Sequence, residues 1–415
     1  MAIYTKDEAR TILEKALSYS KADACEINLS GSNSGNIRYA RNTVSTSGHS
    51  SNQTLVVQSS FGKKSGTATI DEFDDASLEK VVRRAEELAR LSPENPEFME
   101  PLGPQEYDDS LTYKESTANI SPEYRAKVAS SSIDPAAAQD VTAAGFFNDS
   151  EGFSAMINSN GLFAYNRATD MEFTVTMRTN DGTGSGWVSR DYNDVDKFDA
   201  AEASKIAIDK GVMSREARAI EPGKYTVILE PAASNDLLGN MFSSFSARSA
   251  DEGRNFMSAP DGGNKLGQKI VDERVTIWSD PLHPDVPSAT WNGSGQPLKK
   301  TMWIENGVVK NLAYDRYWAE QKGVEPVPFP SNGIMAGGDA SLEDLIRSTN
   351  RGILVTRLWY IRSVDPQTLL YTGLTRDGTF YIENGQIKHP VKNFRFNESP
   401  IIMLNNLETS NGGKD

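Results

Sequence analysis

One order of predicted elements occurs twice in the first half of the sequence, and this repeat strongly limits the possible folds. Residues 5–17 predict a helix, strand-like runs follow, and SGTATIDEFDDASLEKVVRRAEELARL predicts a short strand and a second helix. The same order begins again at Ser121-Pro122 and ends in SGWVSRDYNDVDKFDAAEASKIAIDKG, with Ser65-Gly66 and Ser185-Gly186 at matching points. The pattern predicts two related α-β-β-β-α units, each an antiparallel sheet covered by helices. The alignment needs gaps, so chance similarity of two ordinary α+β segments stays open.

Within each unit, stretches rich in Ser, Gly and Asn predict turns between short strands. The strands predicted for the first unit are CEINLS, NIRYAR and QTLVVQSSF. Those predicted for the second unit are AAGFFND, SAMINSN, GLFAYNR and MEFTVTMRT. Each unit is therefore expected to contain several short strands joined by polar turns.

A chain of 415 residues is expected to form two or three domains. We place the first α+β unit at residues 1–115, the second at 116–222 and a β-rich domain at 223–415. The Pro-rich and acidic stretch 92–110 predicts a linker along the surface. In the β-rich domain the motif Ile-Glu-Asn-Gly occurs at 304–307 and again at 382–385, which predicts two hairpins with type I′ turns in a meander or barrel-like sheet. The predicted fold class is α+β.

Composition excludes several classes of function. The net charge of −14 argues against nucleic acid as the main partner, because a phosphate backbone requires a basic surface. Cys25 is the one cysteine, so neither a disulfide framework nor a cysteine-rich metal site is expected. No apolar run reaches the ~18 residues of a membrane span, and the first residues lack the pattern of a secretory signal. The expected location is the cytoplasm.

The common catalytic motifs are missing from the sequence. The three histidines, His49, His283 and His389, are isolated, so no two stand about one helical turn apart as a zinc helix requires. Neither a GxSxG nucleophile motif nor a Walker A motif occurs. No pair of carboxylates is convincingly placed for acid–base chemistry. We therefore expect no catalytic residues, no metal and no cofactor.

A predicted strand that runs directly into a helix, residues 225–245, is a frame of the kind that often carries catalytic groups. Tyr225 to Leu229 is apolar and β-branched, which predicts a buried strand. Pro231 and Ser234, the expected N-cap, predict the start of a helix. Its apolar face comprises Leu237, Leu238, Met241, Phe242 and Phe245. We call residues 225–245 the elbow. The polar or small positions that it offers are Gly239, Asn240 and Ser243.

A second stretch, RLWYIRSVDPQT, mixes arginines with aromatic residues in an extended segment. Strand alternation would place Arg357, Trp359 and Ile361 on one face and Leu358, Tyr360 and Arg362 on the other. Such a strand can line a groove for a peptide or a carboxylate. A half-buried strand with paired arginines explains the pattern equally well.

Four blocks of the sequence, in their order, resemble the TldD/PmbA family, also known as TldD/TldE or modulator of DNA gyrase proteins. The blocks are RYARNTVSTSG, YTVILEPAASNDLLGNMFSSFS, DPLHPDVPSATWNGSGQPLKKTMWIENGVVKNLAYD and RLWYIRSVDPQTLLYTGLTRDGTFYIENGQIKHPVKNFRF. The resemblance covers nearly the whole chain. It implies a two-subunit metallopeptidase whose dimer encloses the active site and cleaves small or unfolded peptides, in peptide maturation or proteolysis.

In the TldD branch of that family, the elbow helix carries HExxxH, whose histidines hold zinc and whose glutamate is the general base. A cysteine further along the chain supplies another ligand. Here Leu238 and Ser243 stand at the histidine positions, Gly239 stands at the glutamate position, and no cysteine follows. The resemblance thus places the chain with the zinc-free TldE/PmbA branch.

We therefore expect a non-catalytic subunit that pairs with a zinc-bearing TldD-like subunit and binds peptide substrate. The residues expected to face the substrate in the shared chamber are Asn240, Ser243, Arg357, Trp359 and Arg362. Neither nucleic acid nor a membrane is expected as a partner, and the sequence leaves open whether a homodimer forms. Two alternatives also stay open: a stand-alone hydrolase with an unrecognised site, and a protein-binding regulator of a topoisomerase.

Overall fold

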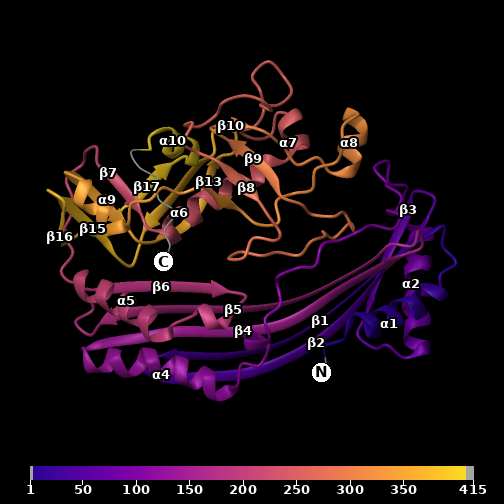
Figure 1. Ribbon diagram of the computed structural model, residues 1–415, viewed down its shortest axis with the longest axis horizontal. Helices are drawn as coiled ribbons and strands as arrows, with labels where there is room; N and C mark the ends of the chain where they lie inside the picture. Colours follow the sequence, from indigo (N-terminus) through magenta and orange to yellow (C-terminus); the bar gives the residue numbers. More distant parts are fainter. Residues whose placement is uncertain (1–2, 408–415) are drawn as a thin grey trace.

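The computed structural model describes residues 3–407, and one six-stranded antiparallel sheet contains the strands of both repeats. The strand order is β3-β2-β1-β4-β5-β6. The strands are β1 (Ala24–Ala40), β2 (Thr43–Phe61), β3 (Lys64–Ile70), β4 (Val141–Asn158), β5 (Phe163–Thr179) and β6 (Ser185–Tyr192). Because β1 pairs with β4 at the centre, the two repeats join edge to edge into one curved sheet (Figure 1).

Two pairs of helices cover opposite ends of this sheet (Figure 1). The helices are α1 (Lys6–Ser18) and α2 (Asp75–Leu91) at one end, and α4 (Pro122–Ala138) and α5 (Ala200–Met213) at the other. Short turns α3 (Glu115–Ala118) and η1 (Val195–Lys197) complete this half of the chain. The element order is therefore α1-β1-β2-β3-α2 followed by α4-β4-β5-β6-α5, with α3 and η1 as additions. The predicted duplication is confirmed, but the expectation of a separate sheet in each unit is wrong, because β1 pairs with β4 and joins the two into one sheet.

The two Ser-Gly pairs have the same packing role in the two repeats. A Cβ on Gly66 of β3 would lie 2.1 Å from the backbone nitrogen of Ala89 in α2. A Cβ on Gly186 of β6 would lie 2.2 Å from the carbonyl oxygen of Ala207 in α5. Each glycine thus lets a helix backbone approach the last strand of its repeat more closely than any side chain would permit.

The turns predicted at the stretches rich in Ser, Gly and Asn are wrong where these stretches lie inside β1, β2, β4 and β5. SGSNSGN, residues 30–36, is the middle of β1 and pairs with both β2 and β4. Its glycines leave room for side chains from β4 and α4 that pack directly against the backbone of β1. A Cβ on Gly31 would lie 2.6 Å from the Phe153 ring, and one on Gly35 would lie 2.0 Å from the Arg125 guanidinium. Close packing therefore accounts for glycines that, in sequence alone, indicate turns.

The C-terminal region is β-rich, as predicted, but it contains three small sheets instead of one meander or barrel. The sheet orders are β10-β9-β8-β11, β16-β15-β12-β7 and β13-β14-β17. The strands are β7 (Thr226–Leu229), β8 (Ile277–Ser279), β9 (Thr301–Glu305), β10 (Val308–Val309), β11 (Ile334–Met335), β12 (Arg351–Val355), β13 (Leu358–Asp365), β14 (Leu370–Thr375), β15 (Thr379–Glu383), β16 (Gln386–Pro390) and β17 (Arg395–Glu398). The helices are α6 (Pro231–Leu238), η2 (Gly239–Phe245), α7 (Ala247–Asp251), α8 (Arg316–Lys322), α9 (Leu342–Ser348) and α10 (Pro400–Asn405).

Both predicted hairpins form, β9–β10 and β15–β16. At their turns Asn306 and Gly307 have φ of 49° and 78°, and Asn384 and Gly385 have φ of 50° and 72°. Positive φ at both central residues is the requirement of a type I′ turn. The two hairpins belong to different sheets, which is why the repeated motif does not produce a single barrel. No helix of the described chain combines the length and apolar character needed to cross a membrane.

The matching glycines lead to a test of the duplication. Gly66→Ala and Gly186→Ala should each lower the free energy of unfolding by about 1–3 kcal/mol, the usual cost of forcing extra atoms into a packed site. Gly103→Ala is the control, since a Cβ there would meet no atom within 4 Å. Chemical denaturation of the three variants measures the effect. If Gly66→Ala or Gly186→Ala were as stable as the wild type, the shared packing role of the two glycines would be contradicted.

Candidate functional site

The elbow begins with β7, which pairs in parallel with β12 and ends at Leu229. Helix α6 starts at Pro231 with Glu230 as its N-cap residue, so the prediction of Ser234 as N-cap is wrong. Pro231 favours the first helical position because its fixed φ suits the helix and its missing N–H is not needed there. The Glu230 carboxylate accepts a hydrogen bond from Lys210 of α5, which ties the elbow to the second repeat.

The elbow helix buries one narrow face. Leu237, Met241 and Phe245 are buried, and the Phe245 ring lies 5.4 Å from the ring centre of buried Trp303. Leu238 and Phe242, predicted for the same face, are only partly buried at its margin. The regular helix ends at Leu238 and continues as the tighter η2. The apolar face therefore anchors the elbow in the core and leaves its other side for contacts.

The side chains at the catalytic positions of the elbow cannot perform metal chemistry. Leu238 has no ligating atom, Gly239 is exposed, and the exposed Ser243 hydroxyl donates to the carbonyl oxygen of Asn240 at 3.0 Å. The Asn240 amide donates to the carbonyl oxygen of Asp236 at 2.6 Å. Both polar side chains thus bond to backbone carbonyls of their own helix.

Zinc, which the TldD branch of the resembled family binds at the elbow, does not fit the residues present here. Zinc needs thiolate, imidazole or carboxylate ligands, three or four of them around one point. Within residues 3–407 no group of three or more His, Cys, Asp or Glu side chains is placed to hold a metal ion. The elbow contributes only Leu238, Gly239 and Ser243 at the expected positions. No chemical step is assigned to zinc on this chain.

Arg357 lies directly before β13 and joins the C-terminal region to the central sheet. Its Nη1 donates to Asp377 Oδ2 at 2.6 Å, and Asp377 is only 4% exposed. Asp377 Oδ1 accepts a hydrogen bond from the Ser185 hydroxyl of β6, also at 2.6 Å. The guanidinium lies 4.0 Å from the ring centre of Trp187 and 5.0 Å from that of Trp359. Arg357 is therefore half-buried, paired with a buried carboxylate and in contact with two aromatic rings.

Strand β13 does not follow the predicted alternation. Between Trp359 and Arg362 the strand contains one more residue than its partner β14, so a bulge interrupts the pleat. Tyr360 has a φ of 57° and is 62% exposed. The Arg362 guanidinium lies 4.4 Å from the Tyr360 ring centre. β13 is an edge strand of its sheet, and Trp359, Tyr360 and Arg362 are all exposed on it.

The elbow and β13 are neighbours, as Figure 1 shows. The Tyr371 hydroxyl of β14 donates to the carbonyl oxygen of Asn240 at 3.3 Å, which ties η2 to the same sheet. Burial raises the pKa of the Asp236 carboxyl of α6, and the charge of Arg357 opposes that shift. The structure thus brings Asn240 and Arg357 into one region, with Trp359 next to Arg357, while Ser243 and Arg362 are exposed on η2 and β13.

Sequence reasoning missed Asp377, Ser185 and Trp187, which surround Arg357. Ser185 and Trp187 flank the glycine of the second Ser-Gly pair, which in the sequence indicated only the matching point of the two repeats. No pattern in the sequence connects that site with Asp377, because 192 positions separate Ser185 from Asp377.

Three family models match the chain. They are the PmbA/TldA metallopeptidase domain 1 at residues 25–89, the central domain at 115–215 and the C-terminal domain at 222–413. The Escherichia coli O157:H7 metalloprotease PmbA is 22% identical over 98% of this chain and 92% of its own length. A metalloprotease of Methanothermobacter thermautotrophicus is 23% identical, but the match spans 63% of this chain and 60% of that protein.

Two solved structures share the fold. TldE from Thermococcus kodakarensis has a TM-score of 0.84 and 20% identity over 97% of this chain and 93% of its own. A protein from Thermotoga maritima, described as a proposed modulator of a DNA gyrase, has a TM-score of 0.87 and 18% identity over 97% and 95%. The three family models together cover most of the sequence, and the chain belongs to the PmbA/TldD metallopeptidase family.

Proposed function

We propose that this chain is the metal-free, non-catalytic subunit of a two-subunit metallopeptidase of the TldD/TldE type. In this proposal a TldD-like subunit supplies zinc and the general base, and this chain completes a chamber for small or unfolded peptides. The observation that carries the proposal is the elbow. Its strand, its helix and its buried face are intact, while Leu238, Gly239 and Ser243 stand at the positions of the zinc ligands and the base.

Hydrolysis of a peptide bond needs an activated water and a polarised carbonyl group. None of the three elbow side chains supplies a metal or a base. Ser243 would need a histidine partner to act as a nucleophile, and its hydroxyl is instead bonded to its own helix. The elbow keeps its strand and helix although it lacks zinc ligands and a base. This is expected where the surface still serves recognition or assembly, since shape complementarity does not depend on metal ligands.

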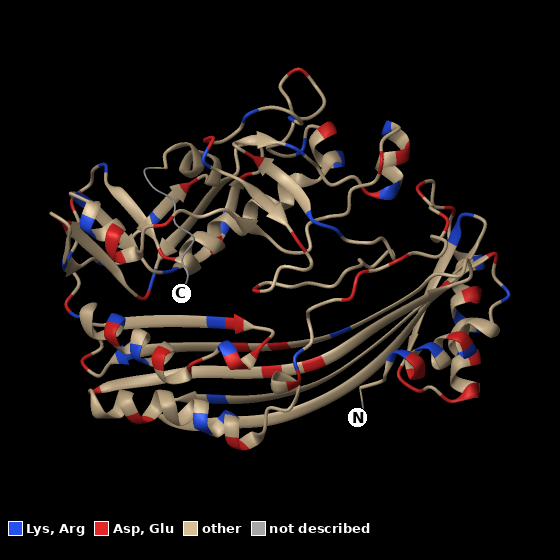
Figure 2. Cartoon of the chain, viewed as in Figure 1, with Lys and Arg blue, Asp and Glu red and all other residues tan. Residues whose placement is uncertain are grey.

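A free strand edge supports a partner on the central sheet. β3 pairs with β2 only from Leu55 to Phe61, so residues 43–50 have β1 on one side and no strand on the other within the described chain. All eight of these residues are exposed and none is Lys, Arg, Asp or Glu, whereas natural edge strands are commonly protected by such residues. Figure 2 shows that the charged residues lie mainly on helices and loops instead of this part of β2. The edge suits pairing with a strand of another subunit.

The first prediction concerns activity. The isolated chain should not cleave short peptides, and cleavage should appear after mixing with the zinc-bearing TldD-type subunit from the same cell. The TldD-type subunit alone is the control, and a metal chelator should abolish the activity of the mixture. Cleavage by the isolated chain that persists in the chelator would instead favour a stand-alone hydrolase.

The second prediction concerns peptide contact at β13. Arg362→Ala should raise the KM of the assembled complex for short acidic peptides about fivefold, the effect of losing one exposed charge contact worth ~1 kcal/mol. Arg347→Ala is the matched control, since Arg347 is also exposed but lies on α9, outside the sheet of β13. Size-exclusion chromatography should show both complexes intact. Equal KM values for the two variants would remove β13 from the peptide site.

The third prediction separates structure from recognition at Arg357. Arg357→Ala leaves Asp377 buried without its nearest cation, and should lower the free energy of unfolding by about 3 kcal/mol. Adding Asp377→Asn should recover part of that loss, because the buried charge is then gone. Thermal denaturation compares both variants with Arg362→Ala, which should melt like the wild type. A wild-type melting curve for Arg357→Ala would show that the ion pair contributes little.

A further inference from the structure

A pocket of about 350 Å³ lies between the first repeat and the C-terminal region, away from the elbow. Its walls come from four parts of the chain. They are the beginning of β1 with the end of β2, residues 98–101 of the segment 92–110 (called the crossing segment below), the loop 293–296 before β9, and the start of α8 with its cap residue. This volume is at the lower end of the range for small-molecule sites, roughly 300–1,000 Å³. The pocket has room for one small ligand.

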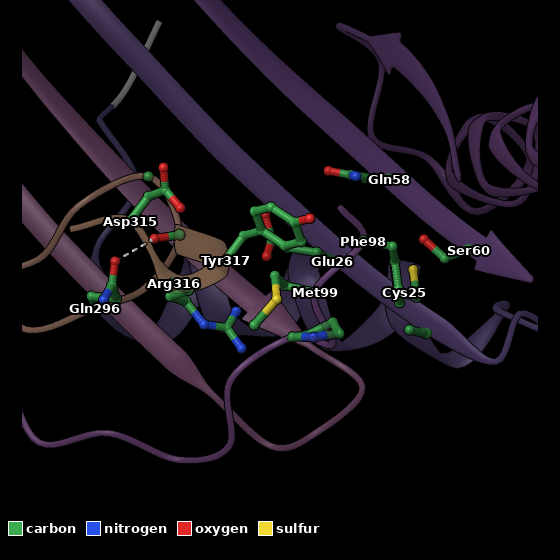
Figure 3. A pocket seen from close by; sticks show the side chains of 14 residues that line it. Cys25, Glu26, Gln58, Ser60, Phe98, Met99, Gln296, Asp315, Arg316 and Tyr317 are labelled. Carbon is green, nitrogen blue, oxygen red and sulfur yellow. Dashed lines mark hydrogen bonds between the residues drawn. The ribbon is translucent and has the colours of Figure 1, made fainter. Parts of the chain in front are cut away.

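Three charged side chains line this pocket: Glu26, Arg316 and Asp315, whose carboxylate already accepts a hydrogen bond from the backbone N–H of Trp318 as the cap of α8. Glu26 of β1 and Arg316 of α8 both face it, and no ion pair within 4 Å connects them in the described chain. Figure 3 shows Arg316, Tyr317, Glu26 and Met99 close together, with Cys25 and Ser60 at the other side. The pocket therefore has an anionic point and a cationic point that do not neutralise each other by direct contact.

Among residues 3–407, the side chains of Glu26 and Arg316 each have one hydrogen bond to the protein. Glu26 Oε1 accepts from the Asn28 amide at 3.2 Å, and Arg316 Nη2 donates to the carbonyl oxygen of Glu100 at 2.7 Å. Burial raises the pKa of the Glu26 carboxyl, and burial lowers the pKa of the Arg316 guanidinium. Partly buried charges of this kind gain from partners that complete their hydrogen bonds.

The remaining walls suit an apolar side chain. Phe98, Met99 and Tyr317 line the pocket, and the thiol of Cys25, whose pKa is raised by burial, adds a small neutral surface. A bidentate ion pair holds the crossing segment against the C-terminal region: Arg248 Nη1 and Nη2 each donate to Glu97 at 2.7 Å. The Arg248 guanidinium also lies 5.8 Å from the ring centre of Tyr317. This ion pair attaches the wall formed by residues 98–101 to the C-terminal region.

We propose that this pocket binds a small zwitterion, a free amino acid or a dipeptide, with its ammonium group at Glu26 and its carboxylate at Arg316. A guanidinium offers paired donors that match a carboxylate, and a carboxylate accepts hydrogen bonds from an ammonium group. The apolar walls receive the side chain. The inference does not rest on the proposed subunit role, because every residue that it uses lies outside the elbow and β13.

The test is isothermal titration of the purified full chain with leucine, phenylalanine and Leu-Gly, each beside its N-acetyl and its C-terminal amide derivative. We expect saturable binding of at least one zwitterion, and at least tenfold weaker binding of its two derivatives, since each lacks one charge. Saturable binding of none of the three zwitterions up to about 10 mM, or equal binding of a zwitterion and its derivatives, would overturn the proposal. This comparison uses only the native protein.

Two variants locate the charges. Glu26→Gln should weaken zwitterion binding about tenfold while leaving the N-acetyl derivative nearly unchanged. Arg316→Gln should weaken zwitterion binding as strongly while leaving the amide derivative nearly unchanged. Glu343→Gln on α9 is the control with a removed exposed charge and should bind like the wild type. Undiminished binding to both pocket variants would place the ligand elsewhere and contradict the proposal.

Discussion

The antiparallel pairing of β1 with β4 is the contact on which the rest of the architecture depends. It runs from Glu26 opposite Asn158 to Tyr39 opposite Gly145, and it converts two repeats into one sheet. The long strands place one helix pair at each end of the sheet and leave its middle open. The second repeat contacts the C-terminal region at two points. Lys210 pairs with Glu230 of the elbow, and the Ser185 hydroxyl donates to Asp377, the partner of Arg357. The first repeat forms one wall of the pocket around Glu26.

Much of this arrangement could be predicted because local patterns determined it. Helix caps, apolar periodicity and the echo of Ser65-Gly66 in Ser185-Gly186 led to the repeated element order, and Asn-Gly dipeptides led to the two hairpins. The strand middles could not be predicted in the same way. A stretch such as SGSNSGN has the composition of a turn, and only contacts with Phe153 and Arg125, far along the chain, explain why its glycines lie in a strand.

The residue types at the candidate site can be taken directly from the sequence, whereas its contacts with distant parts of the chain cannot. The lack of ligands at Leu238, Gly239 and Ser243 is visible in the sequence, because ligand chemistry depends on residue type. The surroundings of Arg357 were not visible, since Asp377 and Trp187 come from other parts of the fold. The bulge between Trp359 and Arg362 also interrupts the expected alternation of β13, and a second register shift follows between Ser363 and Asp365. The predicted peptide role of Asn240, Ser243, Arg357, Trp359 and Arg362 stays a prediction.

Native mass spectrometry of this chain mixed with the TldD-type subunit of the same cell tests the central claim most directly. The account predicts a complex with one copy of each chain. It also predicts that, when the complex is dissociated in the gas phase, zinc stays with the TldD-type subunit and this chain has the mass of its bare polypeptide. A tightly held zinc on this chain, or the failure of the two chains to associate under conditions in which both are folded, would contradict the account.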